Sequence, residues 1–381
     1  MYRREPRRLL DAIRWISAFI VAFGHTWVAV IHGQDGWLAQ LLGALANTRH
    51  SWLVIFFVLS GYLVGGQIML GGARFDLRRY AIDRFSRIYI VLIPALMLTV
   101  ALDGAVFLTA PHNPIYAGPW HAVGDSPPFA NYSLRDILAS LLCLENVIGG
   151  PMGSDGPLWS LGFEWSFYLA LPALMLPAGA LARAWRLPAW LVQAATLAGS
   201  AMLLAAAHMP YAGLLWSIWL CGGVAHLATT RSWSNAALRW IGGVVCLFGF
   251  VAAFRLDYHF SDALVGFGFA LFLSVFPHSE RGIHPGLDQA LSGASYSLYV
   301  THMPVLAAVC AACYGLGLLP QGGVPFGPSS MTVLAGVAAA VTATTWAIHV
   351  VFEVRTGALR RWLIAISTPR LSQPAVIASA D

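Results

Sequence analysis

Long apolar stretches recur along the sequence, and they constrain its fold more than any other feature. Ten of them occupy residues 9–32, 52–70, 88–109, 158–176, 190–207, 213–228, 238–254, 263–276, 291–314 and 331–352. A transmembrane helix needs about 20 apolar residues, and a helix satisfies its backbone hydrogen bonds internally within hydrocarbon. The pattern predicts an all-α, polytopic membrane protein with about ten transmembrane helices. We expect one transmembrane domain at residues 1–366 and a disordered tail at residues 367–381.

The composition agrees with a membrane protein. Hydrophobic residues make up 58% of the chain and charged residues 10%, whereas a soluble protein has about 25% charged residues. We therefore expect the basic residues to contact membrane lipid and not nucleic acid. The cysteines fall in or beside apolar stretches, including the CxxC pair Cys310 and Cys313. We interpret them as small buried residues and expect neither a disulfide nor a metal site.

The arginines are distributed unevenly between the two sides of this ten-helix topology. All 22 basic residues are arginine, and eighteen of them fall on the side of the N-terminus. Only Arg49, Arg135 and Arg255 fall in loops on the other side. Because cytoplasmic loops are enriched in positive charge, we expect both termini in the cytoplasm. The first apolar stretch is then a retained helix and not a cleaved signal peptide.

Polar residues interrupt the first apolar stretch at regular positions. Arg14 and His25 are eleven residues apart, which places them on nearly the same helix face, about 16 Å apart along the axis. Asp11 lies one turn before Arg14 and can pair with it. An ionisable residue within a membrane is costly and by default indicates a functional site. The alternative is that Asp11 and Arg14 lie at the inner interface and that His25 is a hydrogen-bonded core histidine.

Four later segments carry polar residues within or beside apolar stretches. Ser60 lies mid-membrane, either in a ligand site or in a helix contact. Arg84 and Arg87 lie one turn apart, where two guanidinium groups can bind a phosphate or simply anchor the helix at the inner surface. Glu164 needs a partner or a proton, because an isolated carboxylate is strongly disfavoured in hydrocarbon. His302 lies near mid-depth, and a lone histidine there is more often a core residue than a catalytic one.

These residues lie at different depths along the expected helices. Arg84 and Arg87 lie at the inner face, whereas the middle or outer half of the bilayer holds His25, Ser60, Glu164 and His302. The separation predicts a phosphate-bearing ligand that enters from the inside and reacts partway across the membrane.

Five segments, in order, resemble motifs of the acyltransferase-3 family of integral membrane acyltransferases. They are LDAIRWISAFIVAFGH, FFVLSGYL, RFSRIY, LWSLGFEWSFYL and SYSLYVTH. The chain departs from the family at Trp15, where glycine is common, and at Glu353, which is followed by Val354 where proline is common. The resemblance therefore assigns no role to Glu353. We also expect no fused esterase domain, because the chain ends soon after its last apolar stretch.

The resemblance implies an O-acyltransferase with an acyl-CoA donor, most often acetyl-CoA. This donor is a co-substrate and not a permanently bound cofactor. The implied acceptor is a hydroxyl of a glycan or of a glycosylated metabolite, such as a polysaccharide of the cell envelope, and the implied location is the bacterial inner membrane. The resemblance leaves the identity of the acceptor, the acyl length and the oligomeric state open.

The resemblance and the chemistry together suggest roles for individual residues. His25 is the best candidate for the base that takes the hydroxyl proton, because its intrinsic pKa lies near neutrality. Either Glu164 or Asp11 can orient or recharge it, and depth favours Glu164. Arg14 can stabilise the donor or the developing oxyanion. The expected site has the catalytic residues His25, Glu164 and Arg14, the acyl-CoA-binding residues Arg84, Arg87 and Ser60, and the pocket residues Asp11, Trp159, Tyr168 and His302. Whether a covalent acyl intermediate forms on Ser60 or Tyr168 stays open.

A second hypothesis is a proton-coupled transporter or exporter of a small polar or glycosylated solute. The charged face of the first helix would then be a proton or substrate path. Transporters often contain inverted repeats with paired broken helices, and the sequence contains no internal repeat.

Overall fold

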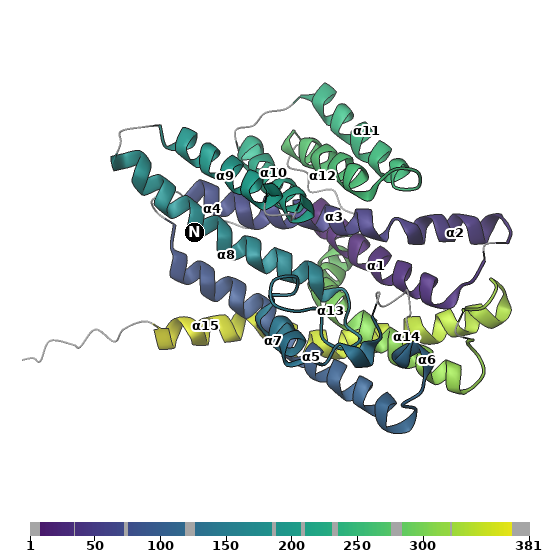
Figure 1. Cartoon of the computed structure of the whole chain (residues 1–381). Helices are drawn as coiled ribbons and strands as arrows, with labels where there is room; N and C mark the ends of the chain where they lie inside the picture. The colour runs from purple at the N-terminus through teal and green to yellow at the C-terminus, as the bar shows by residue number, and fades with distance from the viewer. Residues whose placement is uncertain are drawn as a thin grey trace, which may run out of the picture.

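The computed structural model describes residues 8–33, 35–71, 75–118, 126–184, 188–206, 210–230, 235–275, 284–320 and 322–367. These residues form helices joined by loops, and no strand occurs among them (Figure 1). The α-helices are α1 (Arg8–Val30), α2 (Trp37–Asn47), α3 (Arg49–Ser60), α4 (Gly66–Gly71), α5 (Leu77–Thr109), α6 (Pro114–Ala117), α7 (Leu134–Leu142), α8 (Leu158–Ala184), α9 (Ala189–Ala206), α10 (Pro210–Thr230), α11 (Ala236–Ala252), α12 (Tyr258–Ser274), α13 (Pro285–Gly315), α14 (Pro328–Val351) and α15 (Thr356–Ser367). The predicted all-α architecture is confirmed.

Seven helical spans among the described residues are long and apolar enough to cross a membrane, so the chain is a multi-pass membrane protein. The predicted number of about ten is not confirmed, although each of the ten apolar stretches coincides with helix. The spans do not include α9, α11 and α12. Helices α11 and α12 have 17 residues each, a rise of about 26 Å, which is less than the roughly 30 Å of a bilayer core. The predicted tail after Ser367 and the first seven residues lie outside the described residues.

Four helices begin at the same end of the bundle. We call the end at which α1 begins the proximal end and the end at which it finishes the distal end. Near the distal end of α1, Gly24 lies against Arg49 at the start of α3. The next residue, His50, contacts residues at the starts of α8, α10 and α12. Helices α3, α8, α10 and α12 therefore all begin at the distal end and run in parallel.

A turn of π-helix (Gly61–Gly65) separates α3 from α4, directly after Ser60. A Cβ atom at Gly61 would lie 1.8 Å from the carbonyl oxygen of Trp219 on α10, so only glycine permits this approach. Turns of π-helix are frequent at functional sites. The close contact brings α10 against Ser60, which is one of the predicted site residues.

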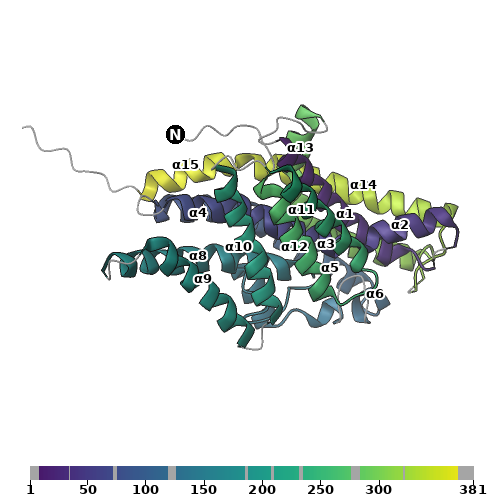
Figure 2. The same ribbon diagram turned by 90° about the horizontal axis from the view of Figure 1, so that it is seen from above.

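The remaining helices enclose this region from both sides. Helices α9 and α14 lie on opposite sides of the bundle in two perpendicular views (Figures 1 and 2). Helix α15 packs beside the start of α5 at the proximal end, where Arg360 pairs with Asp83 at 2.7 Å. On the distal side, Asp103 of α5 accepts hydrogen bonds from Tyr116, Tyr132 and Ser154, and it thereby fastens the loops between α5 and α8 to the bundle.

Candidate functional site

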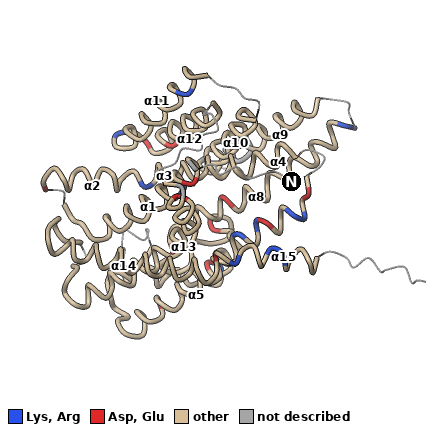
Figure 3. The backbone as a smooth tube through the Cα atoms, turned by 180° about the vertical axis from the view of Figure 1, so that it is seen from behind, with Lys and Arg blue, Asp and Glu red and all other residues tan. Residues whose placement is uncertain are grey.

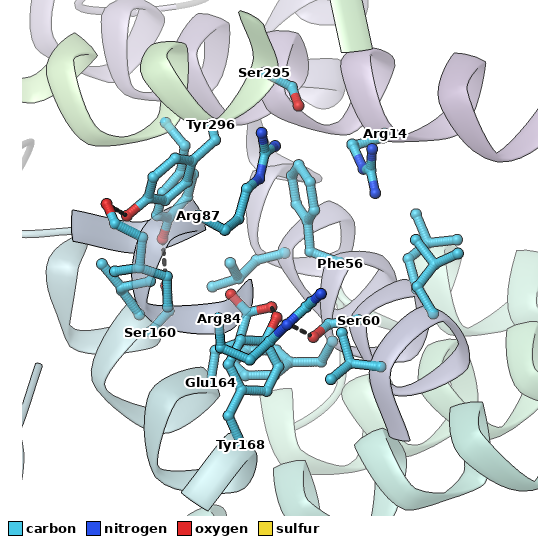
Figure 4. Close-up of a pocket in the computed structure, with 18 residues that line it drawn as sticks. Arg14, Phe56, Ser60, Arg84, Arg87, Ser160, Glu164, Tyr168, Ser295 and Tyr296 are labelled. Carbon is cyan, nitrogen blue, oxygen red and sulfur yellow. Dashed lines mark hydrogen bonds between the residues drawn. The ribbon is translucent and has the colours of Figure 1, made fainter. Parts of the chain in front are cut away.

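A cavity of about 170 Å³ lies between α1, α3, α5, α8 and α13. Hydrophobic side chains line part of its wall, among them Leu53, Phe56 and Ile88. Figure 4 shows the polar side chains around it, which come from all five helices. They are Arg14, Ser60, Arg84, Arg87, Ser160, Glu164, Tyr168, Ser295, Tyr296 and Tyr299. The cavity therefore combines three guanidinium groups with one carboxylate in an apolar setting.

Arg14 and Arg87 have carboxylate partners. Arg14 lies 3.8 Å from Asp11 on its own helix and donates to Ser292 of α13 at 3.2 Å. Arg87 pairs with Glu353 at 2.9 Å. The pairing of Arg14 with Asp11 three residues earlier is as predicted from the helical spacing.

Arg84 differs from the other two arginines. Its Nε atom is buried and has no hydrogen-bond partner in the part of the chain that the structure describes. Its guanidinium carbon lies 5.8 Å from the ring centre of Tyr168 and 5.9 Å from that of Tyr80, within the range of cation–π attraction. A buried donor without a partner is costly, so Arg84 retains unused capacity for an anionic group in the cavity.

A chain of hydrogen bonds links Glu164 to α10. The hydroxyl of Tyr168 donates to Glu164 Oε1 at 2.5 Å. Because that hydroxyl has a single proton, Ser60 must be the donor in its 3.0 Å contact with Tyr168. Trp219 Nε1 donates in turn to Ser60 Oγ at 3.0 Å. The chain fixes the direction of every hydroxyl on this side of the cavity.

Glu353 is a site residue that sequence reasoning missed. It begins the 3₁₀ turn after α14 (Glu353–Arg355) and is only 4% exposed. Besides the ion pair with Arg87, it accepts hydrogen bonds from Ser297 Oγ at 2.6 Å and His349 Nδ1 at 3.1 Å. It therefore holds Arg87 from behind the cavity. Its position as an acidic residue next to an apolar stretch is a signal of function, but Val354 stands where proline is common in the family, so the family motif does not point to it.

His25 and His302 lie against each other across the contact between α1 and α13. His25 Nδ1 is 3.2 Å from His302 Nε2. The other nitrogen of His302, Nδ1, is 2.7 Å from the carbonyl oxygen of Tyr299 and 3.1 Å from that of Leu298, so Nδ1 carries the proton. His302 Nε2 is then an acceptor, and His25 Nδ1 donates to it. This assignment leaves the lone pair of His25 on Nε2, where it can accept a proton.

The structure brings together six of the ten predicted site residues. The residues that line the cavity are Arg14, Ser60, Arg84, Arg87, Glu164 and Tyr168. Asp11 lies behind Arg14, and the pair of His25 and His302 lies farther toward the distal end; none of these three is among the lining residues. Trp159 stacks on His50 instead, with ring centres 6.4 Å apart.

No group of three or more histidine, cysteine, aspartate or glutamate residues within the described ranges has an arrangement that could hold a metal ion. The cavity offers a ligand positive charge from three arginines, Arg14, Arg84 and Arg87. It also offers the hydroxyl groups of Ser60 and Tyr168. This set suits a ligand with phosphate or other anionic groups.

Comparisons with known proteins identify the family. Neither the comparison with curated proteins nor the comparison with solved structures gave a match. A family model described as an acyltransferase domain matches residues 7–350, which include all of the cavity residues and both histidines. The match spans most of the 381 residues, and it confirms the predicted family. This chain therefore belongs to the acyltransferase-3 family of membrane acyltransferases.

Proposed function

We propose that this protein transfers an acyl group from acyl-CoA to a hydroxyl of a glycan or glycosylated metabolite, and that the acyl group is acetyl. The observation that carries the proposal is the cavity lined by three arginines in a chain of an acyltransferase family. Arg84 is the cavity residue most available to a ligand, because its buried Nε atom has no hydrogen-bond partner among the described residues.

The donor is recognised through its phosphates. Coenzyme A carries several negative charges, and arginine binds phosphate through paired, charge-assisted hydrogen bonds. Arg84 is free to form them, and Arg87 adds a guanidinium held in place by Glu353. Arg14 lies on the same cavity wall as α13 and contacts the donor farther along its length.

His25 acts as the base at the acceptor hydroxyl. The hydroxyl oxygen attacks the thioester carbonyl carbon, a C–O bond forms, and the proton passes to His25 Nε2. The C–S bond then breaks, and the leaving thiolate of coenzyme A takes the proton from the imidazolium. His302 keeps the correct nitrogen of His25 unprotonated through the hydrogen bond at Nδ1. Arg14 lies about 16 Å from His25 along α1, so it acts on the body of the donor and not on the same carbonyl group.

Glu164 has a supporting role in this proposal. Its carboxylate accepts a hydrogen bond from Tyr168, which accepts one from Ser60. The chain places a negative charge beside the arginines and holds two hydroxyl groups against the cavity. Glu164 therefore orients the donor side of the site, whereas His302 is the group that orients His25.

The charge distribution supports a cytoplasmic donor. Arginines gather around α15 and the start of α5 at the proximal end (Figure 3). Because cytoplasmic faces are enriched in arginine, the proximal end would face the cytoplasm of a bacterial inner membrane, and acyl-CoA would enter there. The distal end, with His25 and His302, would then face the acceptor.

The proposal is tested with the purified protein in lipid nanodiscs. Wild type with acetyl-CoA and a panel of glycosides should release the coenzyme A thiol, and mass spectrometry should find acetylated glycoside. His25→Ala and His25→Gln should insert and melt like wild type but release thiol no faster than the uncatalysed reaction. Full activity in the His25 variants would overturn the mechanism. Solute flux into vesicles without any thioester turnover would instead support a transporter.

A further inference from the structure

A second cluster of aromatic and polar side chains lies at the distal end, outside the cavity. We call it the distal aromatic cluster, and we define it by the residues His50, Trp159, Tyr211, Tyr258, His259 and Asp262. They come from the first turns of α3, α8, α10 and α12, four helices that are separate in sequence. None of the functional steps described above uses these residues.

The rings of the cluster contact one another. The ring centre of His50 is 6.4 Å from that of Trp159, 6.2 Å from that of Tyr211 and 6.1 Å from that of Tyr258. Tyr258 also stacks on His259 at 4.0 Å. Tyr258 is 51% exposed, and the side chain of His50 is 37% exposed. The cluster therefore offers ring faces and edges that a ligand can reach.

A buried carboxylate organises the polar groups of the cluster. Asp262 is fully buried, and its Oδ2 atom accepts hydrogen bonds from His50 Nε2 at 2.9 Å and from the hydroxyl of Tyr211 at 3.0 Å. Its Oδ1 atom has no hydrogen-bond partner within the described ranges. Tryptophan and tyrosine are enriched at membrane surfaces because their rings are apolar and their polar groups reach water, and this preference requires no buried partner. A buried aspartate that fixes a histidine and a tyrosine goes beyond that requirement and indicates a binding site.

The cluster adjoins the reaction site on two helices. Trp159 directly precedes Ser160, and Leu53 lies one turn after His50; Ser160 and Leu53 both line the cavity. Arg49, the residue before His50, packs against Gly24, the residue before His25. A ligand held by the cluster would therefore lie next to both the cavity and the proposed base.

We propose that the distal aromatic cluster binds the pyranose ring of the acceptor. The C–H face of a pyranose is apolar and stacks on rings such as the exposed Tyr258 and the half-buried Trp159, whereas its hydroxyls exchange hydrogen bonds with groups such as His50. This match of apolar faces and polar edges selects a sugar ring over an open-chain alcohol. The proposal rests on the proposed function, and it assigns the acceptor a site separate from the arginines that bind the donor.

The experiment compares Tyr258→Ala and Trp159→Ala with wild type in nanodiscs, using methyl pyranosides and glycerol as acceptors. Equilibrium dialysis with radiolabelled methyl pyranosides measures binding without donor. Both variants should raise the KM and the Kd for pyranosides about tenfold, while the KM for acetyl-CoA and transfer to glycerol stay unchanged. Phe260→Ala is the matched control, because Phe260 lies on the same turn of α12 and is 52% exposed, close to the 51% of Tyr258. It should behave like wild type.

The outcomes separate this proposal from the proposed function. In one outcome, pyranosides bind wild type and bind the two variants more weakly while no sample turns over the thioester. This result would support the cluster as a pyranose-binding site and would overturn the acyltransferase proposal. Acyl transfer that proceeds with an unchanged KM and Kd for pyranosides in both variants would overturn the cluster as the acceptor site. The same conclusion would follow if no pyranoside binds wild type, or if Phe260→Ala weakens binding as much as Tyr258→Ala.

Discussion

His25 Nδ1 and His302 Nε2 lie 3.2 Å apart, and the backbone carbonyls beside His302 determine which of the two rings donates. The contact joins two helices whose histidines are separated by 277 residues of sequence. It gives His302 a role through His25, as a positioning residue, without requiring His302 to touch the substrate.

His302→Ala should reduce kcat about 100-fold and leave the KM for acetyl-CoA unchanged, because the donor site is intact while His25 loses its orienting partner. His302→Gln should recover part of the rate, since its amide oxygen can accept from His25 Nδ1. Steady-state kinetics of both variants in nanodiscs provide the check. A purely structural role predicts instead that the melting temperature falls in both variants and that Gln gives no rescue.

Arg84→Ala should raise the KM for acetyl-CoA roughly 10- to 100-fold, the loss expected for a charge-assisted hydrogen bond of about 1.5–3 kcal/mol. The Kd of coenzyme A, measured by isothermal titration, should rise by a similar factor. Arg79→Ala is the matched control, because Arg79 lies in the first turns of the same helix but is exposed and does not line the cavity. Equal effects of the two substitutions would mean that Arg84 contributes only general surface charge.

Helical spacing predicted what lies on one helix but not which helices meet. Arg14 and His25 both face α13 in the structure, as expected of residues on one helix face, and they contact Ser292 and His302 there. The eleven-residue separation was enough for this prediction. Nothing in the local pattern indicated that α13 is the neighbour, because pairing between distant helices depends on packing along their whole length.

Glu353 shows the same limit within the site. Arg87 was recognised from its position one turn after Arg84, just before an apolar stretch, but its partner lies 266 positions later in the chain, in a short 3₁₀ turn. The predicted number of spans is not confirmed for a different reason. The apolar patterns of α11 and α12 were read correctly as helices, but with 17 residues each they are not among the seven spans found in the described residues.

Glu353→Gln should raise the KM for acetyl-CoA several-fold, because Arg87 loses the charge that holds its guanidinium beside the cavity. A double-mutant cycle with Arg87→Ala should give a coupling free energy of at least about 1 kcal/mol. Both single variants and the double variant are compared through kcat/KM for acetyl-CoA. Strictly additive effects would show that the ion pair does not contribute to donor binding.

Glu145→Gln should make the stability of the protein less sensitive to pH. Glu145 lies in the loop before α8 and is 1% exposed, and burial raises the pKa of its carboxyl to about 8. The folded state then binds up to one more proton than the unfolded state between pH 4.5, the ordinary pKa of a glutamate side chain, and about 8. Stability conferred by the neutral carboxyl is present at low pH and is lost as the pH rises through this window.

The melting temperature of Glu145→Gln should therefore match that of wild type near pH 5 and exceed it at pH 8. The corresponding difference in the free energy of unfolding at pH 8 should be on the order of a few kcal/mol. Asp136→Asn is the opposite control. Partial burial raises the pKa of Asp136, but hydrogen bonds from Ser133 and Gly150 outweigh this effect and leave the pKa below its ordinary value. Asp136 thus stabilises the fold at neutral pH, and its advantage over Asn should fade as the pH falls. A constant difference between wild type and Glu145→Gln from pH 5 to pH 8 would contradict a buried carboxyl that titrates in this range.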